Sequence, residues 1–129
     1  MKKNTLSNKE INYGRGNVFS PEIYQHFPDT VNIVFSDALH DPRALQFEID
    51  NLLANDLLEK EFFIYYDDLH GQAMINAFGS CFNKLNNFSD KFVNSRIFYC
   101  HGWIGEHEFA HTNGIITNMG FDLEWEKYV

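Results

Sequence analysis

Hydrophobic residues change their spacing along this chain, and each change predicts another element of secondary structure. Alternation across residues 31–36 predicts a strand, and a continuous apolar and aromatic run at 62–66 predicts a strand buried on both faces. Pro21 predicts a short helix that ends before Pro28. Two longer helices are predicted from apolar residues at helical spacing: Leu45, Ile49, Leu52 and Leu53 after the start signal Asp41-Pro42, and Met74, Phe78, Cys81, Phe82 and Leu85 after Gly71.

The C-terminal third of the chain permits two interpretations. Asn113-Gly114 is a strong hairpin-turn signal because both residues accept positive φ, and apolar or small residues occupy the odd positions that follow. We therefore expect strands at 106–112 and 115–127, which form a C-terminal β-meander with a strand at 96–103. If residues 106–118 are helical instead, the chain becomes a regular β-α succession, closer to an α/β sandwich.

These elements predict an α+β fold: a mixed or largely antiparallel sheet of about five strands, with two main helices packed on it. The 129 residues suit one core, so we expect one domain at 21–129 after a flexible, polar N-terminal arm at 1–20. The chain lacks the apolar run of a secretory signal or a membrane span. Cys81 and Cys100 lie in apolar surroundings, which predicts buried free thiols and a cytoplasmic location.

Residues 107–111 read His-Glu-Phe-Ala-His, which resembles the H-E-x-x-H motif of the zincins. On a helix the resemblance implies a zinc hydrolase, with His107 and His111 as ligands and Glu108 as general base. The remaining ligand would come from one of four residues: His101, Asp122, Glu124 or Glu126. Gly114 extends the match toward the metzincin signature, but Thr117 stands where that signature has its third histidine.

A strand gives these histidines a different geometry. Residues four apart on a strand are separated by about 13 Å, too far for both imidazoles to bind one zinc ion. Because the turn signal favours the strand, we expect no metal or cofactor here, and zinc belongs only to the helical alternative.

Composition shifts the functional expectation from catalysis toward binding. The net charge is −8, which disfavours nucleic-acid binding, and the 13 phenylalanines exceed what one small core readily hides. We expect a non-enzymatic acidic binding protein, of the inhibitor or immunity type, whose exposed aromatic patch serves a basic protein partner or a homo-oligomer. No membrane partner is expected. The candidate binding residues are Asp67, Asp68, Trp103, Asp122, Glu124 and Glu126.

Overall fold

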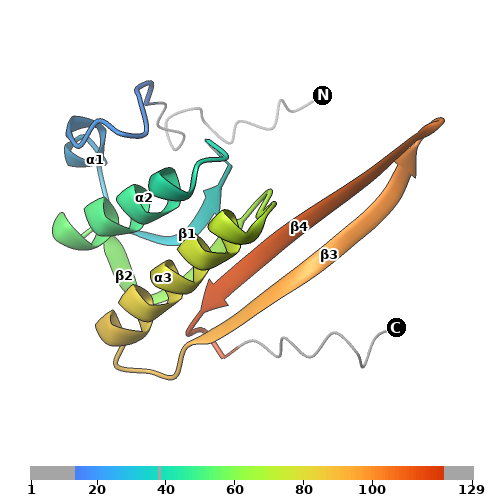
Figure 1. The fold of residues 1–129 in the computed structure, drawn as a ribbon. Coiled ribbons are helices and arrows are strands. Elements are labelled where there is room, and N and C mark those ends of the chain that lie inside the picture. Colours follow the sequence, from blue (N-terminus) through green and yellow to red (C-terminus); the bar gives the residue numbers. More distant parts are fainter. Residues whose placement is uncertain (1–13, 38, 121–129) are drawn as a thin grey trace, which may run out of the picture.

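The computed structural model describes residues 14–37 and 39–120, which form an α+β fold with one mixed four-stranded sheet (Figure 1). In chain order the elements are α1 (Glu22–Gln25), β1 (Val31–Ser36), α2 (Pro42–Ala54), β2 (Leu58–Tyr66), α3 (Gln72–Phe88), β3 (Asn94–Ile104) and β4 (His107–Thr117). The predicted α+β class and both long helices are confirmed. The strand expected at 62–66 begins four residues earlier, at Leu58.

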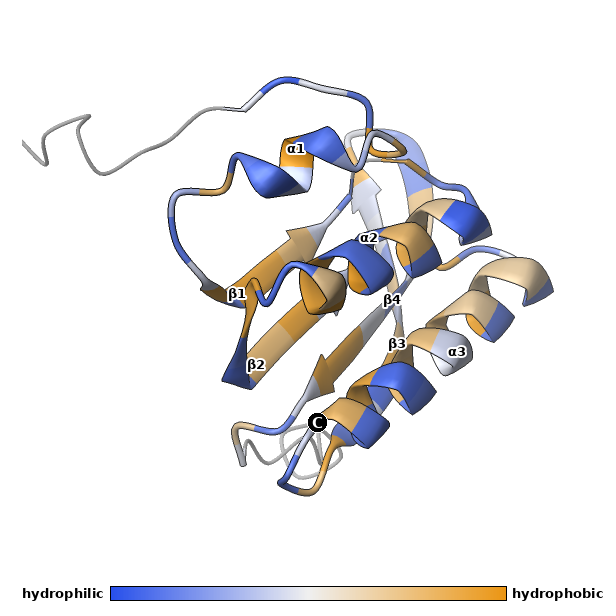
Figure 2. Cartoon of the chain, turned by 90° about the vertical axis from the view of Figure 1, so that its left-hand side faces the viewer, coloured by the Kyte–Doolittle hydropathy of each residue, from blue (hydrophilic) through white to orange (hydrophobic). Residues whose placement is uncertain are grey.

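The strands lie in the order β1-β2-β4-β3. β1 and β2 are parallel and are connected through α2, whereas β4 runs antiparallel to both β2 and β3. α2 and α3 pack on one face of the sheet, as Figure 2 shows with the largely hydrophobic strands β1 and β2 behind the helices. No helix within residues 14–37 and 39–120 is long and apolar enough to cross a membrane.

The core lies between the helices and the face of the sheet that they cover. Alternate residues of β2 supply its centre, and Phe62, Ile64 and Tyr66 are completely buried there. Ile49 of α2 and Leu85 of α3 reach the same cluster with no exposed surface. The apolar residues that recur at helical spacing in the sequence are therefore the ones that α2 and α3 contribute to the core.

The strands expected at 96–103 and 106–112 are confirmed as parts of β3 and β4. The expected C-terminal meander of 96–103, 106–112 and 115–127 differs at its last step, because the chain does not turn at Asn113-Gly114. One hairpin, β3–β4, replaces the meander, and Gly105 turns the chain with φ +60°. The strand expected at 115–127 contributes only residues 115–117 to β4, and its part beyond residue 120 lies outside the described residues. The described sheet consequently has four strands, not five.

Asn113 and Gly114 lie inside β4, although they are a strong turn signal, because packing requires them there. A Cβ on Gly114 would lie 2.5 Å from Cε2 of Phe78 and 2.7 Å from Cδ1 of Leu69. The buried Asn113 accepts a hydrogen bond from the Asp68 amide through Oδ1, at 3.1 Å. Asn113 and Gly114 therefore allow α3 and the segment after β2 to pack close to the sheet, and they do not form a turn.

In the outer part of the hairpin, β3 and β4 pair with each other and with no other described strand. β2 pairs with β4 at Gly114–Thr117, whereas β3 continues to pair with β4 as far as Ile104 and His107. We call residues 99–112 the hairpin arm; Figure 1 shows it extending away from the helices. Cys100 lies on the arm and is exposed, so the expectation that both thiols are buried is wrong for this residue and holds for Cys81.

Candidate functional site

The H-E-x-x-H residues lie on strand β4 and face different neighbours. His107 is opposite Ile104 at the tip of the arm, whereas His111 is opposite Cys100, near the base. Glu108 forms an ion pair with His101, and His111 forms one with Asp68. The helical geometry of the zinc-hydrolase alternative is therefore not adopted, because on this strand His107 and His111 stand about 13 Å apart.

One face of the sheet carries large side chains that the helices do not cover. We call these residues the open face: Ile33 and Phe35 of β1, Phe63 and Tyr65 of β2, and Phe98 of β3. The Phe35 and Tyr65 rings are stacked with centroids 5.0 Å apart, and Tyr65 lies 6.1 Å from Phe98. Ile33 and Phe35 are 67% and 66% exposed. Phe63, Tyr65 and Phe98 are half-buried. Adjacent exposed apolar side chains such as those of Ile33 and Phe35 are typical of a protein-binding surface.

Acidic residues follow the strands that carry the open face. Asp37 comes directly after β1, and Asp67 and Asp68 come directly after β2. Because parallel strands end at the same edge of a sheet, these carboxylates gather at one end of the open face. Partial burial, together with the negative charges of Asp68 and Asp37, raises the pKa of Asp67. The predicted binding residues Asp67 and Asp68 thus lie together at a negatively charged edge.

Asp68 also lies among three histidines, and we call these four residues the Asp68 cluster. His40 Nε2 is 3.2 Å from Asp68 Oδ2, His70 Nε2 is 3.5 Å from Oδ1, and His111 Nδ1 contacts the same Oδ1. The Asp68 side chain is only 15% exposed, and its backbone has a positive φ of 52°. A non-glycine residue in this conformation is held there by its surroundings, here by the hydrogen bond from its amide to Asn113.

His40 and His70 were not among the residues predicted from the sequence. A signal for them exists, since each parallel strand is followed by an aspartate and then a histidine: Asp37 and His40 after β1, Asp68 and His70 after β2. This pattern indicates a shared site only if the two strands are known to be adjacent and parallel. His111 of β4 completes the cluster. It belongs to the H-E-x-x-H segment, but its partner Asp68 does not.

The remaining predicted binding residues fall in two places. Trp103 lies on the hairpin arm and is 63% exposed. It is opposite Glu108, and the nearby Gly102 lies against the ring of Phe109. Asp122, Glu124 and Glu126 lie outside the described residues.

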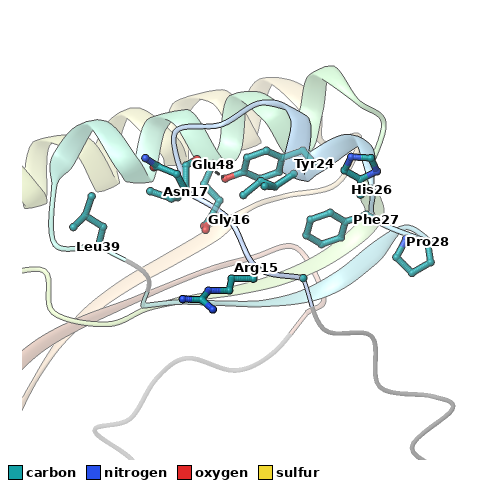
Figure 3. A pocket seen from close by; sticks show the side chains of 12 residues that line it. Arg15, Gly16, Asn17, Tyr24, His26, Phe27, Pro28, Leu39 and Glu48 are labelled. Carbon is teal, nitrogen blue, oxygen red and sulfur yellow. Dashed lines mark hydrogen bonds between the residues drawn. The ribbon is translucent and has the colours of Figure 1, made fainter.

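A hollow of about 740 Å³ lies on the helix side, between residues 14–18, α1 and α2 (Figure 3). Glu48 of α2 and Tyr24 of α1 line it, and Figure 3 shows both side chains directed toward its interior. Burial raises the pKa of Glu48, and burial together with the Glu48 charge raises the pKa of Tyr24 to about 12. Glu48 Oε1 has no hydrogen-bond partner in the part of the chain that the structure describes.

Comparison with known proteins does not add to this picture. The sequence matches no protein-family model and no curated protein. The features that bear on function are therefore the open face, its acidic edge and the Asp68 cluster.

Proposed function

We propose that the protein is a non-enzymatic binding module that holds a basic protein partner against its open face. The observation that carries this proposal is the exposure of Ile33 and Phe35 on the side of the sheet that the helices do not cover, where the Phe35 ring stacks on Tyr65. Removing such side chains from water favours association by roughly 25 cal/mol per Å² of apolar surface buried. A partner protein covers this surface in the bound state.

The charge around the open face supports a partner with cationic residues at its rim. Asp37, Asp67 and Asp68 mark one end of the face, and the whole chain carries a net charge of −8. An apolar centre with a charged edge is the usual anatomy of a protein interface. The acidic edge would speed encounter with a basic partner and reject acidic ones.

The experiment is site-specific photo-cross-linking with benzoylphenylalanine placed at position 35, followed by identification of the protein that is captured. Position 92 is the matched control, because Phe92 is also an exposed phenylalanine, at 81%, but lies between α3 and β3. We expect a basic protein cross-linked from position 35 and absent at position 92.

Titration of that purified partner then measures the contribution of the ring. Phe35→Ser should weaken the dissociation constant about tenfold or more, and Phe92→Ser should leave it within about twofold. Affinity should also fall as salt is raised, because the acidic edge is screened. Equal losses for both variants, or cross-links only between copies of this chain, would refute the proposal of a basic partner on the open face.

A further inference from the structure

We propose that Asp68, His70 and His111 bind one divalent transition-metal ion, such as zinc, at the carboxyl end of the parallel strands. Each residue offers one ligand atom, and these three atoms lie within 4.8 Å of one another. Tetrahedral zinc, with bonds of about 2.0–2.2 Å, holds its ligand atoms roughly 3.4 Å apart. Small side-chain rotations therefore bring the three atoms to ligand distance.

The three ligands come from segments that the fold fixes against each other. His111 is on β4, and Asp68 and His70 lie between β2 and α3. Two hydrogen bonds join this connection to β4: the Asp68 amide donates to Asn113 Oδ1, and the Leu69 amide donates to the Thr112 carbonyl at 2.6 Å. Such anchoring keeps Asp68 and His111 together in the absence of an ion, which lowers the entropic cost of binding one.

The chemistry of the site fits a cation with nitrogen and oxygen ligands. Two imidazoles and one carboxylate bind zinc or a similar ion with at least one position left for water. Asp37 and Asp67 add negative charge beside the site, which favours a bound cation.

His40 completes the surroundings of the proposed ligands without being one of them. Its Nε2 lies 3.2 Å from Asp68 Oδ2 and 3.4 Å from Asp37 Oδ1. A histidine bonded to the far oxygen of a ligating carboxylate orients that carboxylate, as outer partners of metal ligands do. We therefore infer that His40 positions Asp68.

This site differs from the one that the H-E-x-x-H resemblance implies. It uses His111 together with residues 68 and 70, and it uses neither His107 nor Glu108, which lie further along the arm. Asp68 also belongs to the acidic edge of the open face, but metal binding by the isolated chain tests this site without the proposed partner.

The test is calorimetric titration of zinc chloride into the full chain, prepared metal-free and without a histidine tag, with cobalt chloride absorption as a second measurement. We expect one equivalent of zinc, and visible cobalt bands typical of four-coordination by nitrogen and oxygen ligands. His70→Ala should weaken zinc binding at least tenfold. Because His70 is 55% exposed, this variant should fold normally, which circular dichroism checks.

Two further variants distinguish the proposed site from zinc binding elsewhere on the chain. Asp68→Asn should also weaken zinc binding at least tenfold, whereas His107→Ala, which changes an exposed histidine of the same strand, should leave it unchanged. Failure of the wild-type chain to take up zinc at micromolar concentration would overturn the proposal. Equal affinity of the wild type and His70→Ala, or a matching loss in His107→Ala, would overturn it as well.

Discussion

At the scale of single residues, the charge of Glu48 lowers the stability of the folded protein. Its carboxylate is largely buried beside the hollow, and Oε1 lacks a hydrogen-bond partner among the described residues. A carboxyl group whose pKa is raised on folding binds its proton more tightly in the folded state, so its ionisation lowers stability. The cost is absent at low pH and grows as pH rises through the folded-state pKa.

Glu48→Gln should therefore stabilise the protein by about 1 kcal/mol at pH 8, because a neutral amide replaces the buried charge. The gain should shrink as pH is lowered through the raised pKa of Glu48, where the wild-type carboxyl is already protonated. Urea unfolding at several pH values measures it, with the exposed Asp90→Asn as control. A gain that does not vary with pH would contradict a cost that arises from Glu48 ionisation.

Gly114→Ala should destabilise the protein by about 1–3 kcal/mol, since the added methyl group meets Phe78 and Leu69 well inside contact distance. Gly79→Ala is the matched control: its Cβ would meet nothing within 4 Å, and alanine favours the helix by roughly 0.5–1 kcal/mol. Thermal unfolding of both variants checks the pair. A neutral Gly114→Ala would show that α3 shifts freely away from β4.

At the scale of elements, the helices could be predicted and the last hairpin could not. α2 and α3 carry long apolar stripes, and Asp41 caps α2 by accepting a hydrogen bond from the Arg43 amide at 2.8 Å. Asn113-Gly114 misled the prediction because the same two residues that favour a turn also suit close packing inside a strand. The actual turn at Gly105 has a weaker local signal than the one it competes with.

The candidate site was predictable only where it depends on residue type. Asp67, Asp68 and His111 were identified as binding or ligand candidates, the last for a motif that the strand does not assemble. His40 and His70 join them through the parallel pairing of β1 and β2, which no short-range pattern specifies. Sequence spacing finds partners within an element, whereas this cluster is built between elements.

The hairpin arm should open more readily than the rest of the sheet, because two strands paired only with each other are marginally stable in water. We expect amide hydrogen exchange at 100–104 and 107–111 to be at least about tenfold faster than at 63–66 and 114–117. Exchange measured by mass spectrometry or NMR at neutral pH checks this. Equal protection in the monomer would contradict it, and protection gained only on adding the partner would place the arm in the interface.

At the scale of the whole molecule, the core and the arm are separate. Every residue of the buried apolar cluster lies outside residues 99–112. Most of them belong to the helices and β2, and β4 contributes Ile116. The stability of the fold therefore depends little on the arm, which leaves its exposed residues free for recognition.

Replacing residues 100–111 with a two-residue Asn-Gly turn should leave a folded protein, because Tyr99 and Thr112 are paired partners that such a turn can join. We expect cooperative unfolding with a loss of less than about 2 kcal/mol, since only exposed or half-buried contacts are removed. Urea denaturation followed by circular dichroism tests it. Loss of cooperativity would mean that the arm contributes to the core.

The position of β4 has a consequence for how the chain reaches this structure during synthesis. β4 is the last described strand to leave the ribosome, yet it lies between β2 and β3. Until it arrives, β1, α2, β2 and α3 can assemble with the edge of β2 unpaired, and an unpaired strand edge is a template for aggregation. The nascent chain thus carries an unpaired β2 edge until nearly all of the described sequence has been made, and this is the interval in which edge-to-edge aggregation is favoured.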